Sequence, residues 1–527
     1  MMTSIMKASL VPVAGLLFLL SCAKEMPIDN VVPGEKQVTI RVSMPDASTK
    51  VAFTPEEDKL ALSWEEGDCI RVISGSASSV FTVSRLISAH EAEFTGPEVA
   101  GSSFEILCPG TYTSVDEAAN DAVLPAQNGN GSAEHLRFKA LLSGVDNYTE
   151  IAFTNAWAEE HGGSFRQGAA VKLQAKLPEG VSSLKKATLR LNGADYALPF
   201  ENVNVTASGQ VLTAYMMLPW TAISLADGAS QQVYVTDASN EVYSATFATK
   251  GEKTILPGKM NSIVGVKLAL QDFVGGDGTE ENPFLIANTR QLENMMNLYK
   301  NASDPSDKTS FKYWFKLLED VDASTITWTP LNATGSFWKA IDFDGGNHTI
   351  SGLKVTGTYA SFAGVLYGSI RNVVFDGATV SGTTKKGVVA GFLGTTGLPG
   401  SCENVIVRNS SVTGTNYSGG FAGHTRTTGS IVSCRVENTT VQTSTGHAGG
   451  FTAYVDITGD DKYEVPARFT DCHVVDVTVK QDFTGTTELY TGGFIGATAV
   501  PASFTDCTAK ATVSAEIKDV GGFVGSA

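Results

Sequence analysis

Hydrophobic and polar residues alternate along much of the chain between residues 36 and 270, which predicts β-strands with one buried face. The clearest runs are residues 37–44, 104–108, 187–192, 211–217 and 232–236. Trp64, the Gly67-Asp68 turn and the apolar run to Val72 predict a hairpin. We therefore expect an all-β fold over residues 36–270.

The last third of the chain repeats one phrase: a glycine pair or Ala-Gly, an aromatic residue, a small or aliphatic residue, and glycine. Copies lie at residues 389–394, 419–423, 449–453, 492–496 and 521–525, with a weaker one at 363–368. Their aromatic anchors are separated by 29, 30, 43 and 29 residues and are Phe392, Phe421, Phe451, Phe494 and Phe523. Short alternating runs between the copies, with no helical pattern, predict turns of a β-solenoid. We expect the glycines to allow positive φ at corners and close backbone approach, and the rings to form one interior stack.

A row of cysteines accompanies the phrase, one before a short strand in each turn: Cys402, Cys434, Cys472 and Cys507. A metal site or disulfides would be the functional interpretation, but no Cys-x-x-Cys pair is present. Small buried thiols that fill the coil interior are the favoured interpretation.

A short helix is predicted just before the repeats. Residues 275–283 are rich in glycine and polar residues and mark a boundary. After them, Thr289 can cap a helix whose apolar stripe comprises Leu292, Met295, Met296 and Tyr299. Such a helix would cover the first turn of the solenoid, because the end of a stacked array needs a cap.

The repeats resemble the GLUG motif, a Gly-aromatic-x-Gly repeat of bacterial surface proteins. The resemblance covers about residues 275–527. It implies that residues 271–527 form a right-handed parallel β-helix, and it implies no reaction. The sequence stops two residues after Gly525, where no comparable cap follows. We expect the β-helix to be incomplete at this end.

The amino terminus reads as a lipoprotein signal peptide. Lys7 precedes an apolar core at residues 8–20, which is too short for a permanent membrane span. Leu19-Leu20-Ser21-Cys22 is similar to a lipobox, which implies removal of residues 1–21, acylation of Cys22 and an outer-membrane lipid partner. Residues 22–35 would then be a tether, and the protein would be lipid-anchored in the cell outer membrane and surface-exposed.

Residues 36–270 resemble the fimbrillins, lipoprotein subunits of Bacteroidota type V pili and adhesins. The resemblance rests on Trp64 to Val72, on Ala214 to Trp220 and on Leu256 to Met260. It implies two β-sandwich subdomains, which we place at residues 36–165 and 166–270. It also implies cleavage by a trypsin-like protease after the first strand, and strand addition by a neighbouring fimbrial subunit. Lys50 is the candidate cleavage residue, although a solvated loop lysine is the alternative. The coil departs from the shaft-subunit pattern and favours a tip or standalone adhesin.

Composition and motifs argue against several functions. A net charge of −17 argues against nucleic acid as a partner. Residues 342–348 have the Asp-x-Asp-Gly spacing of a calcium loop but lack the distal ligands, so we expect a hairpin turn there. We find no catalytic motif, no metal-ligand spacing among the seven histidines, and no indication of a cofactor.

One insertion stands out as a candidate contact. Residues 458–468 lie in the turn of 43 residues and carry Asp460, Asp461, Lys462 and Tyr463. Inserted loops of repeat proteins often bind ligands, although an idle insertion is equally compatible. We expect a non-catalytic adhesin or tip-like pilus protein that binds a glycan, a host protein or other fimbrial subunits. The alternative is a polysaccharide-binding or polysaccharide-degrading β-helix protein.

Overall fold

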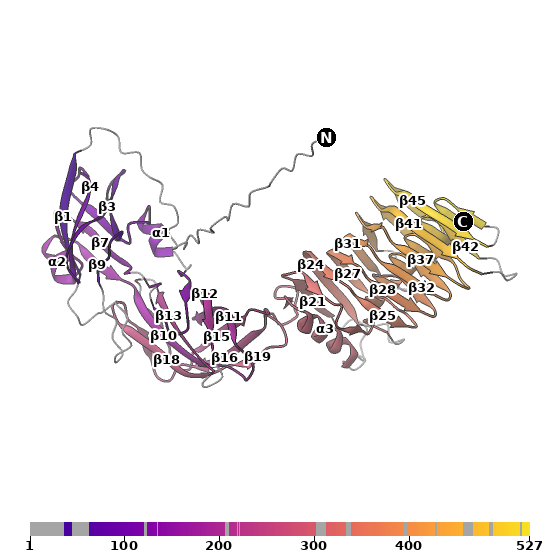
Figure 1. The fold of residues 1–527 in the computed structure, drawn as a ribbon, viewed down its shortest axis with the longest axis horizontal. Helices are drawn as coiled ribbons and strands as arrows, with labels where there is room; N and C mark the ends of the chain where they lie inside the picture. The colour runs from indigo at the N-terminus through magenta and orange to yellow at the C-terminus, as the bar shows by residue number, and fades with distance from the viewer. Residues whose placement is uncertain are drawn as a thin grey trace, which may run out of the picture.

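The computed structural model describes residues 36–44, 63–120, 124–133, 135–136, 138–205, 210–218, 220, 222–301, 312–333, 339–394, 398–426, 429–456, 467–483, 489–516 and 519–527. The fold is all-β, as expected, with three short helices among the described residues. Two β units and a coil of parallel strands follow one another in an elongated, bent arrangement (Figure 1). No helix in the described ranges is long and apolar enough to cross a bilayer.

The first unit is one curled sheet. Its strands are β1 (Gln37–Ser43), β2 (Cys69–Ser74), β3 (Ala77–Ser88), β4 (Glu91–Pro97), β5 (Phe104–Cys108), β7 (Ala140–Val145), β8 (Glu150–Ala152) and β9 (Ser164–Gln167), with helices α1 (Val115–Asn120) and α2 (Asn155–Glu160). They pair in the order β8-β1-β4-β3-β2-β5-β7-β9. Phe153, next to one edge strand, lies 6.3 Å from Phe165 in the other, measured between ring centroids. The sheet therefore closes around its own core, where two facing sheets were expected.

The hairpin around Trp64 differs from the prediction. The chain turns at Glu66-Gly67, but residues 63–65 form no strand. Instead the Trp64 amide donates to the carbonyl of Ala89 at 2.8 Å, and β2 pairs with β3. The turn chemistry was correctly located, while the partner strand was not.

The second unit is a sandwich of two main sheets, beside which two of its short strands, residues 223–225 and 253–255, form a separate two-stranded sheet. Its strands are β6 (Gln127–Asn128), β10 (Ala169–Lys176), β11 (Ser183–Leu191), β12 (Ala194–Asn204), β13 (Val211–Leu218), β14 (Ile223–Leu225), β15 (Ser230–Asp237), β16 (Val242–Ala248), β17 (Lys253–Ile255), β18 (Met260–Lys267) and β19 (Ala269–Leu270). Sheets ordered β13-β10-β18 and β19-β16-β15-β11-β12-β6 share one apolar core. Strand β6 reaches this unit from the expected first subdomain, and buried Gln127 holds it by accepting from the Tyr215 amide at 3.0 Å.

The coil is built from parallel pairs only, among the strands described. A large sheet contains β20 (Phe284–Ile286), β21 (Lys312–Leu317), β22 (Val321–Asp322), β23 (Thr327–Trp328), β24 (Ala340–Ser351), β25 (Lys354–Gly357), β27 (Gly368–Asp376), β28 (Thr379–Gly382), β31 (Gly400–Arg408), β32 (Ser411–Gly414), β35 (Ser430–Val432), β36 (Arg435–Glu437), β37 (Thr440–Thr443), β40 (Ala467–Thr470), β41 (His473–Gln481), β44 (Ala502–Thr505) and β45 (Thr508–Ala515). A second sheet contains β26 (Ala363–Leu366), β30 (Ala390–Leu393), β34 (Ala422–Thr425), β39 (Thr452–Val455), β43 (Ile495–Thr498) and β47 (Val524–Ser526). A third contains β29 (Lys385–Lys386), β33 (Tyr417–Gly419), β38 (Ala448–Gly449), β42 (Tyr490–Gly492) and β46 (Asp519–Gly521).

The glycines of the repeated phrase serve close approach. The chain runs along the third sheet, turns at the glycine pair and returns along the second sheet. A Cβ on Gly419 would lie 2.0 Å from the carbonyl oxygen of Ala422, and one on Gly423 would lie 2.3 Å from the amide nitrogen of Lys386. Neither glycine has a positive φ. Positive φ occurs at Gly368 and Gly394, the last glycines of two other copies. It also occurs at a series of Asn and Asp residues at the coil corners: Asn372, Asn404, Asn409, Asn438, Asp471, Asp476 and Asp506.

The interior column of rings is present, with one correction. Phe421, Phe451, Phe494 and Phe523 stack with centroid distances of 4.5, 4.8 and 4.9 Å. Phe392 is not part of this column, because it pairs with His424 and is partly exposed. Ala390 pairs with Ala422, so Val389 takes the interior position in that turn. The prediction aligned this copy by its phenylalanine, whereas its glycine and alanine fix the register.

The thiols fill space inside the coil, as the favoured interpretation proposed. Cys402, Cys434 and Cys472 are buried and free, and Cys507 is free and half-buried. Burial raises the pKa of Cys434 above its ordinary value, so the group stays a neutral thiol. Cys402 is out of register with the other three, since it pairs with Ile431.

The Asp-x-Asp-Gly segment is not a hairpin. Asp344 and Gly345 lie within β24, which pairs in parallel with β27 on both sides of the bend. The Asp344 carboxylate accepts from the Gly346 amide at 3.0 Å and from Asn372 Nδ2 of the next turn at 3.1 Å. The segment is therefore a corner of the coil. An Asp-Gly sequence favours a turn, but it does not specify whether the chain reverses to form a hairpin.

Helix α3 (Thr289–Asn301) lies at the end of the coil next to the second unit (Figure 1). The predicted stripe of Leu292, Met295, Met296 and Tyr299 is buried against the coil. The cap differs from the prediction: Asn288 Oδ1 accepts from the Gln291 amide at 3.0 Å, while Thr289 is already helical.

The opposite side of α3 joins the coil to the second unit. Arg290 Nε donates to Glu241 Oε1 at 2.7 Å, and Gln291 Nε2 donates to the carbonyl of Asn240 at 3.0 Å. Asn294 Nδ2 donates to the carbonyl of Asp272 at 2.8 Å. The helix is therefore both an end cap and a fastener.

The register of the column gives a stability test. Phe451→Ala removes a fully buried ring between two others and should cost about 3–5 kcal/mol, whereas Phe392→Ala should cost no more than about 2 kcal/mol. A urea titration read out by hydrogen exchange of coil peptides measures both. Equal losses in the free energy of unfolding would contradict this register and would support one in which both rings are interior.

Candidate binding surface

The site residues predicted from the sequence lie outside the described residues. These are Cys22, Lys50, Asp460, Asp461, Lys462 and Tyr463. Lipidation, proteolytic maturation and ligand contact at these positions stay predictions.

A group of aromatic and ionisable side chains on the coil forms two columns. In the third sheet and just before it, Lys385, Tyr417, His447 and Tyr490 occupy equivalent positions of successive turns. In the second sheet, Phe392, His424 and Tyr454 do the same. We call these two sets the ring columns. The two sets lie close to each other, with the ring centroids of Tyr417 and His424 6.0 Å apart.

The rings of the two columns contact one another. The centroids of Phe392 and His424 are 5.0 Å apart, and those of His424 and Tyr454 are also 5.0 Å apart. Between columns, Tyr417 lies 5.6 Å from Tyr454. All of these side chains except His424 are partly exposed. The rings therefore form a row across four turns in which each ring is fixed by its neighbours and most remain partly accessible.

Cations and a carboxylate flank the rings. The Lys385 ammonium lies 4.9 Å from the ring centroids of both Phe392 and Tyr417, and burial lowers its pKa. Arg426 donates to Asp456 at 2.6 Å, and its guanidinium lies 5.6 Å from the Phe392 ring. The ring columns therefore present apolar faces beside hydrogen-bonding groups.

The two histidines of the columns are kept neutral. His424 is 3% exposed, and burial, with help from Arg426 and Lys385, holds its pKa well below its usual range. Burial lowers the pKa of His447 to about 4, and its Nδ1 accepts from the Tyr490 amide at 3.0 Å. Neither ring carries charge at neutral pH.

The neighbouring Lys386 has a structural role. It is fully buried and donates to the main-chain carbonyls of Thr415 and Tyr417. Burial lowers the pKa of Lys386 to about 8. Its contacts connect two turns just beneath the ring columns.

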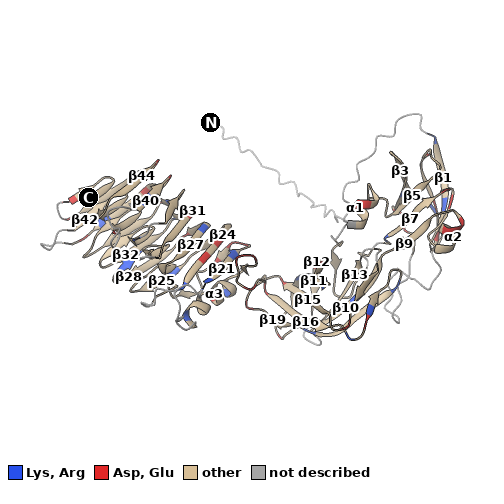
Figure 2. Ribbon diagram, turned by 180° about the vertical axis from the view of Figure 1, so that it is seen from behind, with Lys and Arg blue, Asp and Glu red and all other residues tan. Residues whose placement is uncertain are grey.

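The surface holds few of the groups that hydrolytic sites commonly use. Within the described part of the chain, no group of three or more His, Cys, Asp or Glu side chains is placed to hold a metal ion. Asp456 is the carboxylate next to the rings and is paired with Arg426, while glycoside hydrolysis commonly uses two carboxylates. Charged residues over the coil are scattered rather than gathered on one face (Figure 2).

Sequence reasoning missed the ring columns. A signal was present, because Tyr417, His447 and Tyr490 each stand two residues before the first glycine of a phrase. His424 and Tyr454 each stand three residues after its phenylalanine. Without knowledge of how successive turns align, each of these residues appears in the sequence as an isolated side chain that points outward.

Comparisons with known proteins give partial likenesses. No family model matches the chain. It is 32% identical over 125 residues to "Halomucin" of Haloquadratum walsbyi, which is 22% of this chain and 1% of that protein. The chain thus spans about 1% of the length of this curated relative.

Two solved structures are also similar in part. A "putative immunoglobulin A1 protease" from Bacteroides ovatus is 28% identical, with 48% of this chain and 74% of that chain covered and a TM-score of 0.41. A "putative cell adhesion protein" from Bacteroides fragilis is 12% identical, with 44% and 97% covered and a TM-score of 0.25. Each likeness covers less than half of this chain.

The depressed pKa of His447 predicts a pH effect on stability. The unfolded chain takes up a proton on this ring near pH 6.5, whereas the folded coil does so only near pH 4. The unfolded form then binds more protons between these values, so the coil should lose stability as the pH falls from about 6.5 to about 4. Urea midpoints across this range should fall less in His447→Gln than in the native chain. Identical slopes in both proteins would contradict the effect.

Proposed function

We propose that this chain is a non-catalytic cell-surface binding protein of the adhesin type, whose coil contacts glycans through the ring columns. The observation that carries the proposal is the row of partly exposed Tyr, Phe and His rings on successive turns. The apolar face of a sugar ring can pack on such rings, while its hydroxyl groups meet Lys385, Arg426 and Asp456.

The repetition favours an extended ligand. Parallel strands place equivalent residues one strand spacing apart, about 4.8 Å, so four turns present contacts along roughly 15 Å. A chain-like glycan can use several of these contacts at once, each of them weak. Polysaccharide cleavage is the competing outcome, and it would appear as depolymerisation by the purified protein.

We also propose how the protein is held at the cell. Acylation at Cys22 would supply an outer-membrane anchor. The adhesin role and this anchor are mutually consistent, because a surface ligand must be reached from the membrane.

We further propose that assembly with fimbrial subunits would use the position of strand β1. It lies between β4 and β8, and its Ile40 and Val42 are buried in the core of the first unit. Removal of β1 after cleavage at Lys50 would leave two unpaired strand edges and an apolar groove, which a neighbour's strand could fill.

Mass analysis of the mature protein tests anchoring and cleavage together. A chain that begins at acylated Cys22 supports a lipid anchor with β1 retained. A chain that begins at Val51 supports maturation and strand exchange. An unmodified chain that retains residues 1–21 in exported protein would contradict both proposals.

Binding through the ring columns is tested with Tyr417→Ala and Tyr454→Ala in the purified protein. A glycan array identifies the ligand, and calorimetry should then show affinity lowered about two- to tenfold by each variant, since a stacked ring contributes about 0.5–1.5 kcal/mol.

Tyr367→Ala is the matched control, because Tyr367 is a partly exposed coil tyrosine outside the ring columns. Its affinity should equal that of the native chain. Glycan binding that survives both column variants would place the binding surface elsewhere.

A further inference from the structure

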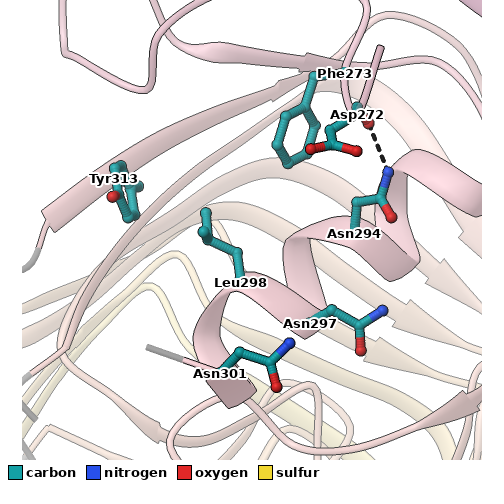
Figure 3. Close-up of a pocket in the computed structure, with 7 residues that line it drawn as sticks. All are labelled: Asp272, Phe273, Asn294, Asn297, Leu298, Asn301 and Tyr313. Atoms are coloured by element: carbon teal, nitrogen blue, oxygen red, sulfur yellow. Dashed lines mark hydrogen bonds between the residues drawn. The ribbon is translucent and has the colours of Figure 1, made fainter. Parts of the chain in front are cut away.

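A pocket lies where the second unit meets the coil, away from the ring columns (Figure 3). Its volume is about 440 Å³, within the range of small-molecule sites. One wall is α3, another is the Asp272-Phe273 segment that follows β19, and Tyr313 of β21 closes the third side. The pocket therefore spans the junction between the two parts of the molecule.

The apolar lining is held in place by packing. Phe273 stacks on Phe284 with centroids 4.5 Å apart and planes at 24°. Tyr313 lies 5.6 Å from the same Phe284 ring, and Leu298 is packed against the coil core. Rings fixed in this way offer a preformed surface, which lowers the entropy lost on binding.

The polar lining is a row of amides. Asn294, Asn297 and Asn301 are spaced by three and four residues along α3, so they lie on one side of the helix. Asn294 is engaged with the carbonyl of Asp272. No hydrogen bond to another described residue is found for the side chains of Asn297 and Asn301, which stand beside the pocket in Figure 3. Each amide can both donate and accept.

The charges of the residues that line the pocket restrict the class of ligand that it can bind. Among the seven lining residues there is no lysine or arginine, and Asp272 supplies a carboxylate. An anionic ligand would meet repulsion and no cation. A neutral ligand with hydroxyl groups around an apolar ring face would satisfy the amides, the carboxylate and the aromatic wall together.

From these observations we infer that the pocket is a second binding site that takes a neutral sugar residue. This site is independent of the ring columns and does not require them to bind glycan. Asp272 and Phe273 belong to the linker, the segment that joins β19 of the second unit to the coil, while the other walls belong to the coil. An occupied pocket therefore also adds contacts between the linker and the coil, at the junction that α3 fastens.

The test uses the full purified protein with galactose, mannose and N-acetylglucosamine as free sugars. Ligand-observed NMR and calorimetry should show saturable binding of at least one sugar, and the anionic N-acetylneuraminic acid should not displace it. The double variant Asn297→Ala and Asn301→Ala should weaken this binding by about tenfold or more, as expected for two lost hydrogen bonds.

Lys300→Ala is the matched control, because Lys300 is exposed on α3 and does not line the pocket. Its affinity should stay within about twofold of the native value. The double variant should remain folded, since alanine favours the helix more than asparagine does, and its unfolding midpoint verifies this. Tyr417→Ala should leave binding of the free sugar unchanged, which separates this site from the ring columns.

Either of two results overturns the inference. One is the absence of saturable binding for all three sugars. The other is binding that the pocket variant leaves intact.

Discussion

The coil depends on one steric constraint, the contact of two strand backbones with no side chain between them. Each turn runs inward along the third sheet, reverses at a glycine pair and returns along the second sheet, and a Cβ on Gly419 would lie 2.0 Å from the Ala422 carbonyl oxygen. The reversal places Phe421, Phe451 or Phe494 in the interior, where each buries an entire ring. No single turn could shelter such a ring, so the turns stabilise one another.

The same constraint determines where binding groups can stand. Since the close backbone contact leaves no room for a Cβ at the glycine positions, larger side chains on these strands stand at the remaining positions. Parallel register then repeats the position at every turn, so rings such as Tyr417 and His447 become columns. The surface expected to bind is thus a direct product of the way in which the interior is packed.

Much of the fold follows from the sequence because its signals are local. Alternation located strands such as β13, and the stripe of Leu292 to Tyr299 located α3 and its buried face. The errors occurred where register decides. Phe392 has the residue type of an interior anchor, but it lies three residues beyond the interior position, which Val389 occupies. Cys402 likewise pairs with Ile431 and not with the next cysteine. The ring columns depend wholly on register, and the pocket joins segments from the linker, α3 and β21, so neither could be located from the sequence.

Helix α3 shows why a site of different chemistry arises at this end of the coil. A helix has no free strand edge, so it ends the parallel ladder and covers the first turn with its apolar stripe alone. Its polar sides are then left to other contacts. Arg290 and Gln291 attach the second unit. The side of the helix with Asn297 and Asn301 lines the pocket next to Asp272 and Phe273. Repetition produces an extended surface along the coil, and the interruption of that repetition produces a single, bounded pocket.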